Sequence, residues 1–487
     1  MKHRKLPLAA LILAIAFGSS AAAVAVADAE IPDLPTINRT LTLADALALA
    51  RADNVALSQA RADAALSLAM VGSAAAGEKP GVSATTYATT GDSNNILTTS
   101  SGVAPQDLLS VPSRGFADQN ITVMVPLFTG RKLENAVGAA RAQSDASESG
   151  IAESLLTVQQ SVTDAYVDAL LKTALVGVAQ ARLDAEDEQV RVTAQRVQTG
   201  ASAPVDLLRE QAEQADAHQG VTAAQGEVLL ALVVLKSALG VSQSSTITLS
   251  DTLESVSQAD PDVHNQEPSN PSPSAPIVGN PNSPVGLAHP RGANSTIVVD
   301  ESQATAAAEM SRPVLAAARE QIAAARAAVA GAQSAYAPQV YGVGMADASA
   351  DSQGDGSVGY TIGLTASLPL YDAGERRSEV DAAKARLARA IADAQAVRQT
   401  VDQEAASAWI NSQTAIEQVT TAQTGVTAAQ QAYALADLRY NAGKSTAADR
   451  LESLAALTEA RGKLAESQAA AIRASIRLET ATGIVHR

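Results

Sequence analysis

The sequence RYNAGKSTAADRLE at residues 439–452 interrupts a long helical pattern, and RVQTGASAPVDLL at residues 196–208 does the same. Each begins with Arg, has Gly four positions later, Asp six positions after the Gly, and Leu two positions after the Asp. The two arginines are 243 positions apart. Glycine often ends a helix because it adopts a left-handed conformation, and a proline, as at position 204, is tolerated in the first turn of the next helix. Both stretches therefore predict the tip of a helical hairpin.

The two tips belong to a tandem duplication. Further landmarks recur at the same offset of 243 residues: Pro126-Leu127-Phe128 with Pro369-Leu370-Tyr371, and Ala238-Leu239-Gly240 with Ala481-Thr482-Gly483. Upstream, Leu57 to Arg61 matches Leu315 to Arg319, and Pro80 matches Pro338, at an offset of 258 residues. Because several landmarks keep one offset, we expect each half to fold as one copy of the same unit.

This comparison divides the chain into four parts. Residues 1–27 are a signal peptide, and 241–302 are a Pro-rich linker or equatorial segment. The first repeat, 28–240, is predicted to contain a helix at 43–76, barrel strands near 82–90 and 119–127, a long helix at 130–198, a tip at 199–205 and a helix at 206–239. The second repeat, 303–487, is predicted to contain a helix at 303–335, barrel strands near 339–346 and 358–370, a long helix at 373–441, a tip at 442–447 and a helix at 448–482.

The N-terminus is typical of a secretory signal peptide. Lys2, Arg4 and Lys5 precede an apolar run, and Ala27 ends a small-residue cleavage site; a retained anchor helix is the alternative. Removing these three positive charges changes the net charge from −16 to −16 − 3 = −19. Such an acidic chain is not expected to bind nucleic acid. Cysteine is absent, which excludes a disulfide framework and thiolate chemistry.

Long helices are indicated by the distribution of prolines and of apolar residues. No proline lies between Pro126 and Pro204, and none follows Pro369. Val380, Ala383, Leu387 and Ala390 follow the three-and-four spacing of a coiled-coil seam. At about 1.5 Å per residue, the stretch 130–198 would span roughly 100 Å, far longer than a globular helix. An ordinary fibrous coiled coil is the alternative.

The segments between the helices alternate like outer-membrane strands. Tyr360, Ile362 and Leu364 alternate with Thr361 and Gly363, and most of the few aromatic residues cluster in or near these segments. We find no apolar run after the signal peptide that would make a membrane helix, so we expect the strands to span the membrane. Four strands cannot close a barrel, and open edges cannot face lipid, so several chains must share it. Soluble hairpins are the alternative.

Enzyme signatures are not found in the sequence. The five histidines are scattered, and neither a phosphate loop nor a nucleophile elbow is present. Asp347, Asp351 and Asp355 could suggest a calcium site, but a solvated hairpin loop explains them better. We therefore expect no catalysis, no cofactor and no metal.

The tips hold the candidate functional residues. Asp449 and Glu452 lie on one helix face and would form a ring of carboxylates in a symmetric assembly, which attracts cations. Arg439, Lys444 and Arg196 could pair across neighbouring tips and hold them closed. The alternative is that Asp206 and Asp449 only complement the dipole of their own helix.

Taken together, the signal peptide, the duplication, the Pro-Leu-aromatic entries and the twin tips resemble the TolC-type outer-membrane efflux protein family over residues 40–240 and 303–485. The resemblance implies a mainly α fold with a small membrane β-barrel. An internally duplicated protomer would give four strands and long coiled-coil helices to a shared trimeric β-barrel and a periplasmic α-barrel. It also implies a periplasmic adaptor and an inner-membrane exporter as partners, with outer-membrane lipid around the strands.

The same resemblance assigns residues at the tips. Adaptor docking would involve Thr199, Gly200, Ala201, Ala442, Gly443 and Lys444. Tyr440 and Asp206 correspond to a closing network, and Asp449 and Glu452 to an acidic constriction. At one tip position where the family has an arginine, this chain has Ser445, and Lys444 is the candidate substitute for that arginine. The Pro-rich stretch 261–290 is also longer than the corresponding segment usual in the family. The implied function is a passive outer-membrane exit duct of a tripartite efflux or type I secretion system that exports small molecules or proteins. The alternative is a non-transporting structural coiled-coil protein of the cell envelope.

Overall fold

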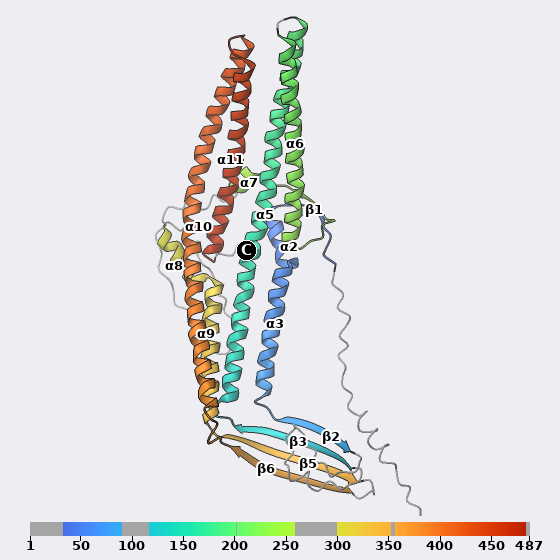
Figure 1. Ribbon diagram of the computed structural model, residues 1–487, viewed down its shortest axis with the longest axis vertical. Helices are drawn as coiled ribbons and strands as arrows, with labels where there is room; N and C mark the ends of the chain where they lie inside the picture. Colours follow the sequence, from blue (N-terminus) through green and yellow to red (C-terminus); the bar gives the residue numbers. More distant parts are fainter. Residues whose placement is uncertain (1–32, 90–115, 201, 259–299, 352–355, 484–487) are drawn as a thin grey trace, which may run out of the picture. The chain divides into compact units, whose positions relative to one another are not determined.

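Two long helical hairpins and two β-sheets make up the computed structural model, which describes residues 33–89, 116–200, 202–258, 300–351 and 356–483 (Figure 1). The predicted signal peptide, Ala201 and Asp355 lie outside these residues, as does most of the Pro-rich segment. The chain forms two units. One contains Ala65–Asp145 and Glu320–Ile391, and the other contains Asp33–Ala64, Ala146–Arg319 and Ala392–Arg487.

The first unit contains a four-stranded antiparallel sheet with the order β2-β3-β5-β6. Its strands are β2 (Gly81–Thr89), β3 (Phe116–Phe128), β5 (Gln339–Asp351) and β6 (Gly356–Ser367). All four lie where alternation predicted strands, but β5 continues to Asp351, beyond the predicted end at 346, and β6 stops before the predicted end at 370. Pro369 explains the early end of β6, because proline has no N–H for the ladder.

The two faces of this sheet differ in chemistry. On β6, Val358, Tyr360, Ile362 and Leu364 are 74–87% exposed. The residues between them are small or polar: Ser357, Gly359, Thr361, Gly363 and Thr365. Successive strand residues point to opposite faces, so β6 contributes apolar side chains to one face and small or polar ones to the other, where they pair with Tyr341, Val343 and Met345 of β5. Within the part of the chain that the structure describes, β2 and β6 each have one edge without a partner strand.

The turn from the sheet into each long helix has the same backbone conformation in both repeats. Gly130 and Arg131 have φ of 60° and 70°, and their counterparts at the offset of 243 residues, Ala373 and Gly374, have φ of 53° and 93°. Left-handed residues other than glycine are strained, and each repeat places glycine at one of the two positions. A Cβ at Gly130 would lie only 2.3 Å from the Cβ of Ala337. The duplication has therefore kept a conformation while the side chains changed.

Each repeat contributes one long helical hairpin. The first pairs α5 (Lys132–Gln198) with α6 (Pro204–Leu239), and the second pairs α10 (Glu375–Asn441) with α11 (Ala447–Ala481). Helices α5 and α10 have 67 residues each, in agreement with the long helices predicted at 130–198 and 373–441. Helices α6 and α11 begin two residues and one residue before the predicted starts at 206 and 448.

The prediction of one helix at 43–76 and one at 303–335 is wrong in detail, because each is divided in two. The first consists of α2 (Leu43–Asp53) and α3 (Val55–Ala76), and the second of α8 (Glu301–Ser311) and α9 (Pro313–Gln333). Asn54 and Arg312 between them have extended backbones. The Asn54 side chain accepts a bond from Ala56 N at 2.9 Å, and Arg312 precedes a proline, which disfavours helical conformation. A 3₁₀ turn, η2 (Ser334–Tyr336), follows α9.

A small parallel sheet lies in the second unit. Strand β4 (Thr246–Leu249) pairs with β1 (Asn38–Leu41), and the sequence did not reveal β1. A short helix, α7 (Leu253–Gln258), follows. Tyr166 of α5 is fully buried beside this sheet, and its hydroxyl donates to Leu41 O at 2.9 Å and to an Asp251 carboxylate oxygen at 2.8 Å. The sheet is thereby fixed to the long helix.

Helix α6 corrects the expectation that no segment after the signal peptide is apolar enough to make a membrane helix. It is long and apolar enough to cross a membrane by length and composition, with a window of mean hydropathy 1.5 of which 17% is buried. The end of the same helix packs into a core, because Leu235 and Leu239 are completely buried. Leu229, Leu230, Val233 and Val234 are instead exposed and form an apolar face.

Candidate functional site at the hairpin tips

Both tips turn at a glycine with a left-handed backbone. Gly200 has φ of 76° and Gly443 has φ of 70°, and a Cβ on either would meet no heavy atom within 4 Å. The requirement for glycine is therefore conformational and not steric. Thr199, Gly200, Ala442 and Gly443 are all exposed, as the docking role proposed from the resemblance needs.

The acidic residues at the start of the returning helices act as caps within this chain. Asp449 accepts a hydrogen bond from Thr446 N at 3.0 Å, and its own N donates to the Thr446 hydroxyl at 3.2 Å. The bond from the Thr446 backbone lowers the pKa of Asp449. Asp206 similarly accepts from Ala203 N at 3.2 Å and from the Ser202 hydroxyl at 3.0 Å. The single chain thus uses both carboxylates for capping, and a role in a constriction stays a prediction.

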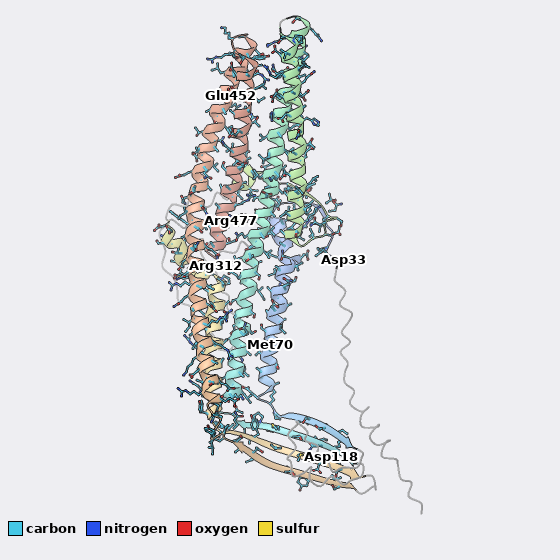
Figure 2. All side chains as sticks on the ribbon, viewed as in Figure 1. Asp33, Met70, Asp118, Arg312, Glu452 and Arg477 are labelled. Atoms are coloured by element: carbon cyan, nitrogen blue, oxygen red, sulfur yellow. The ribbon has the colours of Figure 1, made fainter. Side chains whose placement is uncertain are left out.

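The predicted cationic partners of these acids do not contact them. Lys444 and Arg439 are exposed, and no ion pair of either is found among the described residues. They are linked only through the backbone, where Lys444 N donates to Arg439 O at 2.8 Å. Glu452 is also exposed, next to the tip of the α10–α11 hairpin (Figure 2). The hydroxyl of Ser445 is buried and has no hydrogen-bond partner in the described part of the chain.

Arg196 and Tyr440 bring the two hairpins together. The guanidinium carbon of Arg196 on α5 lies 5.1 Å from the centroid of the Tyr440 ring on α10. Arg196 also donates to the side-chain oxygen of Asn441 at 3.1 Å. Tyr440 is 9% exposed, so this cation–π contact is partly desolvated and therefore stronger than a surface contact. The sequence predicted a pairing role for Arg196, and within this chain its partners are an aromatic ring and an amide.

Near this contact lies a buried ionic cluster, which the sequence comparison missed. The same Nη2 atom of Arg450 on α11 lies 3.5 Å from a carboxylate oxygen of Glu186 on α5 and 3.4 Å from one of Glu210 on α6. All three side chains are 1% exposed. The guanidinium carbon of Arg450 is 5.9 Å from the Tyr440 ring centroid. Tyr440 therefore contacts one arginine from each hairpin.

Burial dominates the electrostatics of this cluster. Desolvation raises the pKa of Glu186, and the positive charge of Arg450 opposes this effect. The pKa of Glu210 is raised for the same reason and with the same opposing charge. Both carboxylates are therefore easier to protonate than an exposed glutamate.

The cluster escaped detection because it is asymmetric. At the offset of 243 residues, Glu186, Glu210 and Arg450 correspond to Ala429, Ser453 and Leu207. A comparison that looks for what the repeats share cannot find it. The sequence did contain a signal for the cluster: positions 183, 186, 189 and 193 follow helical spacing, and the structure buries all four. A glutamate in such a seam needs a buried partner.

Comparisons with known proteins agree with this architecture. Residues 46–241 and 305–484 match the family described as outer membrane efflux protein. Outer membrane efflux protein BepC of Brucella suis biovar 1 (strain 1330) is 24% identical over 362 residues, which cover 73% of this chain and 70% of BepC.

Solved structures share the fold at low sequence identity. CusC matches with a TM-score of 0.70 and 17% identity, covering 94% of this chain and 95% of its own. VceC of Vibrio cholerae matches with a TM-score of 0.67 and 18% identity, covering 91% of this chain and 96% of its own. The resemblance drawn from the sequence is confirmed. Because the family match spans most of the chain, this protein belongs to the outer membrane efflux protein family, and it resides in the outer membrane.

Proposed function

We propose that three copies of this chain form a passive exit duct through the outer membrane. The observation that carries the proposal is the sheet β2-β3-β5-β6, which has one apolar face and two unpaired edges among the described strands. In lipid, unpaired edges leave backbone groups unsatisfied, so the edges of neighbouring copies must pair. An eight-strand barrel is filled by its own side chains, whereas twelve strands from three copies leave an opening.

The exposed face of α6 supports assembly. Leu229, Leu230, Val233 and Val234 are 49–67% exposed, and an apolar face of this kind is typical of an interface between chains. We expect the helices of a neighbouring copy to cover it. The high hydropathy of α6 is then explained by burial of this helix against the helices of a neighbouring copy.

At the tips, we expect a periplasmic adaptor to dock and to couple the duct to an inner-membrane exporter. The exposed residues Thr199, Gly200, Ala442, Gly443 and Lys444 offer an accessible surface there. Energy would come from the exporter, and no bond-making step is assigned to this chain. The exported cargo would be small molecules or proteins.

Gating would also occur at the tips. In a three-fold assembly, Asp449 and Glu452 of each copy would form rings of carboxylates that favour cations. Asp206, Arg439 and Lys444 would then contact neighbouring copies, because within one chain the two cations have no acidic partner among the described residues.

Cross-linking in cells tests the partner, and the mass of the purified protein tests the assembly. A photo-reactive side chain at Lys444 should yield a cross-link to an envelope adaptor in cells, and the same substitution at the exposed helical position Gln418 should not. The purified, detergent-solubilised protein should have the mass of three chains. A monomeric mass, or cross-linking that is equal at both positions, would contradict the proposal.

A further inference from the structure

Three buried charged side chains from three helices meet near the tips. Arg450 of the second hairpin lies between Glu186 and Glu210 of the first, and all three are 1% exposed. One nitrogen of Arg450 serves both carboxylates, at 3.5 and 3.4 Å. Neither carboxylate therefore receives the bidentate fork that makes arginine pairs strong.

The cluster has an excess of one negative charge when both glutamates are ionised. Arg182 of α5 does not remove this excess, because it contacts Glu213 at 3.4 Å and Asp216 at 2.9 Å on α6. Arg450 also lies over the ring of Tyr440 on α10, with 5.9 Å between its guanidinium carbon and the ring centroid.

Two polar atoms of the cluster have no hydrogen-bond partner. Within the described part of the chain, these are Oε1 of Glu210 and Nε of Arg450, both buried, and the Gln189 side chain is a further polar group that acts on the Glu210 carboxyl. Keeping an excess negative charge out of water is costly, and a proton on one carboxylate removes that charge. The charge balance of the buried cluster therefore favours the uptake of one proton.

We propose that Glu186, Arg450 and Glu210 form a proton-dependent latch that holds the two hairpins of one protomer together, and that it is tightest when one glutamate carries a proton. The proton brings the buried cluster to neutrality, so less charge has to be kept out of water. When the hairpins separate, both glutamates enter water and release the proton. The tip gate proposed above would then loosen as pH rises.

The direction of the pH dependence follows from proton counting. Burial raises the pKa of both glutamates in the latched state, so this state binds more protons than the separated state. The latch is strengthened as pH falls through the raised pKa, down to about 4.3, the ordinary value for glutamate. For one linked proton, the ratio of latched to separated hairpins changes by up to about tenfold for each pH unit in this window.

The chain has no cysteine, so introduced cysteines can be labelled without a background. We suggest spin labels at Gln198, at the end of α5, and at Ala448, in the first turn of α11; both positions are exposed. Co-expression with an excess of unlabelled chain ensures that most of the labelled assemblies contain a single labelled protomer. Pulsed electron–electron distance measurements then report the separation of the hairpins within one protomer.

The decisive variants are Glu210→Gln and Glu186→Gln, which remove one negative charge and keep the shape. The unmodified protein should show a short distance at pH 5.5 and a growing long-distance population up to pH 9. Each variant should keep the short distance across the whole range. Glu188→Gln is the matched control, since Glu188 lies on the same helix, is exposed and pairs with Arg191, and it should retain the pH dependence of the unmodified protein.

Arg450→Met leaves two carboxylates buried without a cation and is expected to separate the hairpins at every pH. If it does not assemble, Arg450→Met combined with Glu186→Gln and Glu210→Gln removes all charge and should give a latch that pH does not affect. A distance distribution that is the same from pH 5.5 to 9, or a Glu210→Gln variant as pH-dependent as the unmodified protein, would overturn the proposal. The inference rests on the proposed function only for its gating consequence. Failure of the duct would show as missing conductance, while the distances would still report the latch.

Discussion

Arg196 of the first hairpin overlies the ring of Tyr440 in the second, with 5.1 Å between the guanidinium carbon and the ring centroid. This contact joins two stretches that began as copies of one sequence, since both residues lie in the twin tips. Arg450 approaches the same ring at 5.9 Å. The tyrosine is thereby one of the points at which the two hairpins of one protomer are coupled.

Replacing Tyr440 by Leu should weaken this coupling, because it removes the π face that both arginines contact. A partly buried cation–π contact contributes about 0.5–2 kcal/mol, so we expect faster amide exchange at the ends of α5 and α10 by roughly twofold to thirtyfold. Tyr440→Phe keeps the ring and serves as the control, with exchange close to that of the unmodified protein. Equal exchange in both variants would show that the ring contributes nothing.

The tip glycines should resist substitution for conformational reasons. Gly443→Ala forces a side chain into a left-handed backbone at φ 70° and should cost about 1–2 kcal/mol locally. Gly425→Ala is the matched control, because Gly425 lies inside α10 with no heavy atom within 4 Å of its Cβ position. It should stabilise the helix by about 0.5–1 kcal/mol. Hydrogen exchange along α10 and α11 measures both, and a cost at Gly425 that exceeds the cost at Gly443 would contradict the assignment.

Neighbouring positions on β6 should respond differently to a charge. Ile362 is 83% exposed on the apolar face, and Ile362→Lys should cost about 2–4 kcal/mol in a membrane strand. Thr361→Lys points to the opposite face, where β6 carries only small or polar residues, and should assemble normally. The yield of assembled protein in the outer-membrane fraction is the readout. Similar yields for the two variants would mean that the apolar face does not meet lipid.

The capping role of Asp449 and the effect of its charge on ion selectivity can be tested separately. Asp449→Ala together with Glu452→Ala should lower cation selectivity, measured as the reversal potential across a salt gradient. Thr446→Ala removes the hydroxyl that accepts from Asp449 N but keeps the carboxylate, so it should leave selectivity unchanged. If Thr446→Ala changes selectivity as much as the double variant does, the effect belongs to the fold of the tip.

The pH dependence of the Asp449 cap has a definite sign. Its pKa is lowered because the ionised form accepts the bond from Thr446 N. The cap is therefore complete above the ordinary aspartate pKa and is lost as pH falls through the lowered value. This is opposite to the direction expected for the buried glutamates, so the two effects can be told apart.

Much of the fold could be predicted from local pattern. Period-two alternation located all four strands of the sheet β2-β3-β5-β6, and the absence of proline with regular seams located the 67-residue helices. Strand β1 was missed because it has four residues, and its partner β4 lies about two hundred positions away, with Asn38 opposite Thr246. The break at Arg312 had a sequence signal that the prediction did not use, because Arg312 precedes a proline.

The candidate site was predictable only in part. Comparison of the repeats found Arg196, Tyr440 and both capping acids, because the two halves share or nearly share them. It could not find Glu186, Glu210 and Arg450, which exist in one half only and meet through tertiary packing. The partners of Lys444 and Arg439 stay a prediction, since they would come from neighbouring copies.

Single-channel recording in planar lipid bilayers tests the central claim most directly. The purified assembly should give discrete conductance steps, and Tyr440→Leu should increase the open level or the open time, because it loosens the hairpins at the gate. Stable insertion into the bilayer without conductance, in both the unmodified protein and the Tyr440→Leu variant, would contradict the account of this protein as an exit duct.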